Sequence, residues 1–109
     1  MSDADTIASY ESVWGLTKRM RDAASGNQWD ELIALESERY ALVKGLMAKD
    51  DGDLSNAVLN ARKADLIRNI LDCDAVTRSL SEAWMAELRK ILNSVGTEKK
   101  LSNAYAAFE

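Results

Sequence analysis

The stretch LIRNILDCDAVTRSLSEAWMAELRKILNSV, residues 66–95, contains neither glycine nor proline and is rich in residues that favour helices. Nine of its residues follow one another at steps of three or four: Leu66, Ile70, Cys73, Thr77, Leu80, Trp84, Leu88, Ile91 and Val95. They cover eight turns at about 3.63 residues per turn, the period of an almost straight α-helix. The pattern therefore predicts one long helix, from about Leu54 to Val95, with a single buried seam.

Two shorter helical patterns precede this stretch, at about residues 5–25 and 28–48. The first has one apolar stripe: Ile7, Tyr10, Val13, Trp14, Thr17, Met20 and Ala24. The second has two: Trp29, Leu32, Ile33, Glu36, Tyr40, Val43 and Met47, and beside them Leu35, Leu42 and Leu46. Two adjacent stripes predict a helix that contacts more than one neighbour. We expect Asp3 or Asp5 to cap the first helix, Gly26 to end it and Asn27 to cap the second.

The expected fold is all-α, a single domain over residues 1–109. Period-two alternation is missing and β-branched residues are few. Short connections make the three main helices an antiparallel bundle or hairpin. After Gly96, residues 97–109 predict a short fourth helix with one apolar stripe: Leu101, Tyr105 and Phe108. Such a segment is too short to be helical alone, so it requires a surface to dock on.

The composition excludes several classes of function. The chain has 109 residues, no histidine, one cysteine and a net charge of −4. Without histidine it lacks His-dependent triads and most catalytic zinc sites. Its acidic balance argues against direct binding of nucleic acid or of an anionic membrane. The acidic N-terminus does not resemble a signal peptide, and a lone cysteine is typical of the reducing cytoplasm.

The sequence predicts no enzymatic activity, no bound cofactor and no metal site. Asp50–Asp53 has only a superficial likeness to a calcium loop, because no late glutamate follows, and it is interpreted as a solvated turn. Glu36, on an apolar stripe, is expected to pair with Arg39 or with an arginine of another helix. Cys73 lies on the seam, where a buried cysteine behaves as a small apolar residue.

The helix lengths differ, and this difference points to binding. The third helix has about 42 residues against about 21 in each of the others, so its C-terminal half is expected to be incompletely covered. A fourth segment folded back, a second copy of the chain or a partner could cover the apolar residues there: Trp84, Leu88, Ile91 and Val95. Alternatively, the shorter helices lie further along, or the long helix breaks near Asp72–Asp74.

Several motifs in their order resemble the FliT family of flagellar export chaperones, from about Trp14 to Tyr105. The motifs are Gln28-Trp29-Asp30, Ile67-Arg68-Asn69-Ile70-Leu71-Asp72, Glu87-Leu88, Ile91-Leu92 and Lys100-Leu101-Ser102-Asn103-Ala104-Tyr105. The resemblance implies a helical hairpin that binds the C-terminal segment of the filament-cap protein FliD, keeps it soluble and delivers it to the type III export gate. It also implies contacts with the export ATPase complex and, in some bacteria, inhibition of the flagellar master transcription activator FlhDC.

The leading hypothesis is thus a cytoplasmic chaperone with an apolar client-binding face. The expected partner-binding residues are Ile67, Leu71, Trp84, Met85, Leu88 and Leu92, and the expected regulatory lid is Leu101, Tyr105 and Phe108. The resemblance implies that the segment with Tyr105 covers the groove of the free chaperone. A self-assembling structural bundle, in which the same face makes a homodimer, and a protein-binding transcriptional antagonist are the alternatives.

Overall fold

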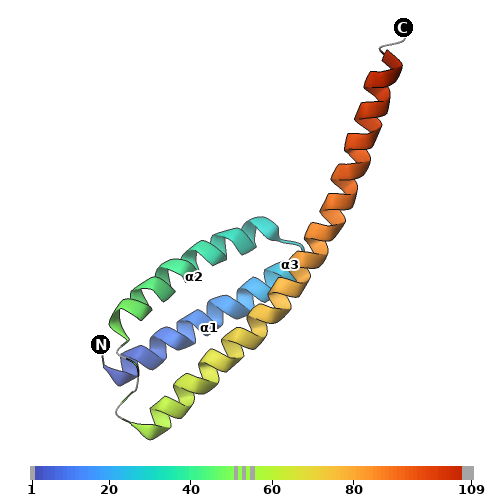
Figure 1. The fold of residues 1–109 in the computed structure, drawn as a ribbon. Coiled ribbons are helices and arrows are strands. Elements are labelled where there is room, and N and C mark those ends of the chain that lie inside the picture. Colours follow the sequence, from blue (N-terminus) through green and yellow to red (C-terminus); the bar gives the residue numbers. More distant parts are fainter. Residues whose placement is uncertain (1, 51, 53, 55, 107–109) are drawn as a thin grey trace. The chain divides into compact units, whose positions relative to one another are not determined.

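The computed structural model describes residues 2–50, 52, 54 and 56–106, with side chains described up to residue 94. The described chain forms α1 (Asp3–Ser25), α2 (Trp29–Lys49) and α3 (Ala57–Ala106), and no strand occurs among these residues (Figure 1). The all-helical class is confirmed. The separate fourth helix is not confirmed, because the backbone of α3 continues through Gly96 to Ala106.

The chain divides into two compact units, Met1–Arg78 and Ser79–Glu109. In the first unit, consecutive helices run in opposite directions, as their short connections require (Figure 1). α1 packs on α2, and α3 reaches both, since the Cys73 thiol lies 3.7 Å from the Thr17 carbonyl oxygen and Asp74 pairs with Arg39. This unit is an antiparallel three-helix bundle. The second unit is the rest of α3, and the helix does not break at residues 72–74.

The core of the first unit follows the stripes predicted for α1 and α3. Leu66 and Thr17 are completely buried, and Cys73 and Thr77 of the predicted seam are nearly so. The other buried core residues are Thr6, Ile7, Val13, Leu16, Met20, Ala23, Ala24, Leu32, Leu35 and Leu46. The period of about 3.6 residues therefore placed the inward faces of two of the three helices correctly.

The prediction for α2 is wrong in one respect. Its buried residues are Leu32, Leu35 and Leu46, whereas three large members of its longer apolar stripe are exposed: Ile33, Tyr40 and Met47. α2 packs on α1 and reaches α3 through the bond from Arg39 to Asp74, and the side chains that it buries are Leu32, Leu35 and Leu46. One apolar edge of α2 is left facing solvent.

Asn27, not Gly26, provides the left-handed residue that ends α1. Its φ is 58°, a conformation that asparagine tolerates better than most residues. The Gln28 N–H donates to the Ala23 carbonyl at 2.8 Å and the Asn27 N–H to the Ala24 carbonyl at 3.3 Å. These two bonds form a Schellman motif. Asn27 therefore does not cap α2, whose N-cap residue is Gln28 without a side-chain bond.

Side-chain caps begin α1 and α3. The Ser2 hydroxyl accepts from the Asp5 N–H at 3.1 Å, so Ser2 is the cap that we expected of Asp3 or Asp5. The Asn56 side-chain oxygen accepts from the N–H groups of Val58 and Leu59. Both caps satisfy backbone donors that a helix start would otherwise leave unpaired. α3 consequently begins at Ala57, three residues later than predicted.

A cluster of three side chains joins α1, the end of α2 and α3. The Tyr10 hydroxyl donates to Asp50 at 2.6 Å, and the Lys63 ammonium lies 2.7 Å from the same carboxylate. Lys63 also donates to the Gly52 carbonyl and lies over the Tyr10 ring, 5.5 Å from its centroid. Hydrogen bonds from Lys63 and Tyr10 lower the pKa of Asp50 to about 2, whereas burial and the Asp50 hydrogen bond raise the pKa of Tyr10 to about 12. Asp50 is therefore ionised in the folded protein at neutral pH.

We predict that Asp50→Asn lowers the free energy of unfolding by about 1–2 kcal/mol at pH 7, because charge-assisted hydrogen bonds are lost. The Asp50 pKa is lower in the folded chain than in the unfolded chain, so its contribution is complete above about pH 4 and lost as the pH falls towards 2. Urea unfolding from pH 7 to 2.5 should show the two proteins converging at the acid end. A difference that stays constant with pH would contradict this prediction.

We predict that Leu66→Ala lowers the free energy of unfolding by about 2–5 kcal/mol, because it leaves a cavity at a completely buried position. Leu71→Ala is the matched control on the same helix, since Leu71 is 63% exposed. We expect the control to change stability by less than about 1 kcal/mol. Chemical denaturation followed by circular dichroism measures both, and equal losses would show that the core is placed wrongly.

Candidate functional site

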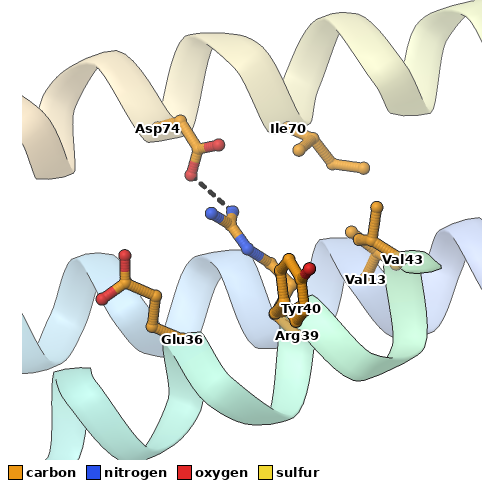
Figure 2. A pocket seen from close by; sticks show the side chains of 7 residues that line it. All are labelled: Val13, Glu36, Arg39, Tyr40, Val43, Ile70 and Asp74. Atoms are coloured by element: carbon orange, nitrogen blue, oxygen red, sulfur yellow. Dashed lines mark hydrogen bonds and ion pairs between the residues drawn. The ribbon is translucent and has the colours of Figure 1, made fainter.

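A groove of about 340 Å³ opens on the first unit where its three helices meet (Figure 2). Val13 of α1 is buried beneath it, and the other lining residues come from α2 and α3: Glu36, Arg39, Tyr40, Val43, Ile70 and Asp74. Apolar side chains line most of it, and one acid–base pair spans it from α2 to α3. The groove combines an apolar lining with a few fixed polar groups, a combination typical of binding sites.

The polar centre of the groove is the guanidinium group of Arg39. It lies 2.6 Å from the Asp74 carboxylate and donates to the Thr17 hydroxyl at 3.2 Å. About a fifth of each charged side chain is exposed, so both charges are largely removed from water. Thr17 in turn donates to the Val13 carbonyl at 2.7 Å. This chain of bonds holds the three helices at a fixed separation beneath the groove.

Tyr40, which lines the groove, belongs to a row of exposed apolar residues on α2 that we expected to find buried. Ile33, Tyr40 and Met47 are 61%, 69% and 75% exposed and recur every seven residues. Glu36 and Val43 lie between them, so the five residues follow at steps of 3, 4, 3 and 4. We call these five residues the α2 edge. Its spacing is that of a helix face that packs against another helix.

Two of the predicted partner-binding residues lie on α3 close in sequence to the lining residues Ile70 and Asp74. Leu71 is 63% exposed and lies one turn before Asp74, and Ile67 is half-buried two turns before Asp74 on the same face. Ile67 also lines a neighbouring hollow with Lys63 and Asn60. Ile67 and Leu71 therefore lie beside the groove on α3, next to its lining residues Ile70 and Asp74, and neither is part of its lining.

The other predicted binding residues belong to the second unit. Trp84 and Leu88 are half-buried, while Met85, Ile91 and Leu92 are 45%, 49% and 59% exposed. They lie on α3 within three turns of one another. The side chains of Val95 and of the predicted lid, Leu101, Tyr105 and Phe108, lie outside the described residues. The lid therefore stays a prediction.

Glu36 and Arg39 do not pair as expected. Arg39 bonds to Asp74 and Thr17, and the described residues include no ion-pair partner for Glu36, which is exposed (Figure 2). Asp74 was not singled out in the sequence because it stands one residue beyond the seam position Cys73. Asp74 is an acidic residue next to a core position, and α3 packs near a helix that has an arginine on its inner side. That combination is the signal that could have identified the pair.

Neither a membrane span nor a metal cluster occurs among the described residues. No helix among them is both long and apolar enough to span a membrane. No group of three or more cysteine, aspartate or glutamate side chains among them is placed to hold a metal ion. The predicted turn at Asp50–Asp53 falls partly on residues 51 and 53, which lie outside the described structure.

We predict that Asp74→Ala lowers the free energy of unfolding by about 1–3 kcal/mol, because it leaves the largely buried Arg39 guanidinium without a counter-charge. Glu11→Ala is the matched control, since Glu11 pairs with Arg62 at 3.6 Å and about half of each side chain is exposed. We expect the control to cost less than about 0.5 kcal/mol. Thermal melts of both variants measure this difference, and similar shifts would contradict it.

The fold and the groove define a helical-bundle protein with a groove lined largely by apolar side chains on its first unit. A family model described as "Flagellar protein FliT" matches residues 7–107 of the chain. The chain therefore belongs to the FliT family.

Individual relatives agree with this assignment. The chain is 28% identical over 100 residues to a flagellar protein FliT of Cronobacter sakazakii, covering 92% of this chain and 82% of the relative. It is 26% identical over 100 residues to one of Citrobacter koseri, with the same coverage. It is 21% identical over 104 residues to one of Photorhabdus laumondii, covering 95% and 83%.

A solved structure supports the fold. The crystal structure of flagellar protein FliT from Bordetella bronchiseptica superposes with a TM-score of 0.73 at 29% identity, covering 79% of this chain and 97% of that chain. Membership of the family supports the role of a flagellar export chaperone. The resemblance stated from the motifs is thereby confirmed at the level of the family.

Proposed function

We propose that this protein binds the C-terminal segment of the flagellar filament-cap protein FliD in the groove between α2 and α3. The family assignment supports the export-chaperone role, and the groove supports the site. The observation that carries the proposal is the exposure of large apolar side chains in and beside the groove. Tyr40 lines it, Ile33 and Met47 lie on the same face of α2 as Tyr40, and Leu71 follows the lining residue Ile70 on α3.

The mechanism is exclusion of water and of other chains. Apolar surface on a monomeric protein tends to associate, and pairing it with a complementary face removes it from water at about 25 cal/mol per Å². The groove supplies that face, with the Arg39–Asp74 pair fixing its width and Val13 closing its floor. The client segment is held in a non-aggregating state without consumption of a nucleotide.

The finer roles extend this proposal and rest on the family resemblance. They are a cytoplasmic location, delivery of the client to the export gate, contact with the export ATPase complex and inhibition of the master transcription activator FlhDC. Trp84, Met85, Leu88 and Leu92 would bind a further part of the client or another partner. The segment with Leu101, Tyr105 and Phe108 would act as the lid that competes with it.

We predict that Leu71→Asp weakens binding of a FliD C-terminal peptide at least tenfold, because an apolar client that extends from the groove over this position must desolvate the new carboxylate. The free energy of unfolding should change by less than about 1 kcal/mol, since Leu71 is already 63% exposed. Val58→Asp is the matched control: Val58 is 76% exposed on α3 and lies about 140° round the helix from Leu71. Fluorescence anisotropy measures the affinity and urea unfolding the stability.

Retention of affinity in Leu71→Asp would rule out a client that extends from the groove over Leu71. An equal loss of affinity in Val58→Asp would show that the added negative charge weakens binding wherever it is placed on α3. If the peptide does not bind the unmodified protein and the chain forms dimers, the result contradicts the proposed function and favours the alternative of a self-assembling bundle.

A further inference from the structure

The α2 edge contains one residue that does not suit an apolar docking face. Glu36 stands between Ile33 and Tyr40 at steps of three and four residues, where a helix that packs on another helix normally has an apolar side chain. It lines the groove together with Tyr40 and Val43 (Figure 2). A helix laid on this edge would therefore cover the Glu36 carboxylate.

The charges around Glu36 do not neutralise it. Arg39, one turn further along α2, is engaged 2.6 Å from Asp74 and donates to Thr17. The lining of the groove contains two carboxylates and one guanidinium group, so its net charge is −1 when no client is bound. Among the described residues Glu36 forms no ion pair. Covering an ionised carboxylate without a partner is costly, and a cation from the client removes that cost.

We propose that Glu36 is a specificity-determining residue that pairs with a lysine or arginine on the apolar face of a helical client segment docked along the α2 edge. The proposal rests on the proposed function and adds to it the chemistry of the client. The client helix would have apolar residues at steps of three and four opposite Ile33, Tyr40 and Met47, interrupted by one basic residue. That residue would fix the register, because sliding by one turn would place it against Ile33 or Tyr40.

The charge of the groove favours such a partner over a second copy of this chain. In a parallel pairing of two α2 edges the two Glu36 carboxylates would face each other, and like charges at close range repel. A basic residue on a client helix instead gives opposite charges at the same layer. A second copy in the antiparallel arrangement is the competing occupant, and the test below distinguishes it.

The test measures binding of a labelled FliD C-terminal peptide to the full chain at low and high salt. Glu36→Gln keeps the size of the side chain and removes its charge, and we expect affinity to fall about threefold to tenfold at low salt. The difference should narrow at high salt, because ions screen the pair. Glu38→Gln is the matched control, since Glu38 is exposed on α2 about 200° round the helix from Glu36. It should bind as the unmodified protein does.

A charge exchange then identifies the partner group. A set of peptides is made in which one lysine or arginine at a time is replaced by glutamate. The affinity of each peptide is measured for the unmodified protein and for Glu36→Lys. One peptide should bind Glu36→Lys more tightly than it binds the unmodified protein, and the others should not. Unchanged or tighter binding of the original peptide by Glu36→Gln, or compensation by no peptide, would overturn the proposal.

The failure of this proposal can be told apart from the failure of the proposed function. If Leu71→Asp abolishes binding while the Glu36 variants bind normally, the groove binds the client and Glu36 takes no part. If neither substitution affects binding, the groove is not the client site and both proposals fall. If Glu36→Gln alters the monomer–dimer equilibrium in sedimentation but not peptide binding, a second copy occupies the edge and the specificity role is overturned.

Discussion

The Arg39 guanidinium group ties the three helices of the first unit together at one point. From α2 it donates to the Asp74 carboxylate of α3 at 2.6 Å and to the Thr17 hydroxyl of α1 at 3.2 Å. A guanidinium group so far removed from water is stable only with its partners in place. Apolar side chains alone could pack at several registers, whereas the bond geometry of this group allows few. The width and floor of the groove follow from that constraint.

The groove exists because α2 has more apolar surface than its neighbours cover. Leu32, Leu35 and Leu46 fill the contact with the rest of the bundle, and the apolar residues one-quarter turn away remain at the surface. Retaining such residues at the surface favours association with other chains. The exposed apolar side chains of α2 are therefore the observation on which the proposed client site depends.

The ends of the helices position this surface. The Schellman motif at Asn27 turns the chain from α1 into α2 within three residues, and the Tyr10–Asp50–Lys63 cluster joins the far end of α2 to both other helices. α2 is thus held at both ends, and its exposed edge lies along a rigid element. Rigid presentation lowers the entropic cost of binding, because fewer side chains and less backbone must be ordered.

The sequence by itself determined the helical class, the extents of α1 and α2 to within a few residues, and the inward faces of α1 and α3. These features depend on local propensity and on the period of the helix, both of which act within a few turns. The family motifs added the class of function. Periodicity could not decide which of two stripes on α2 faces inward, because both fit the same period. Only the tertiary structure buried Leu35 and Leu46 and exposed Tyr40, and only it paired Arg39 with Asp74, 35 residues away. Contacts at that separation depend on how whole helices pack, which no local pattern encodes.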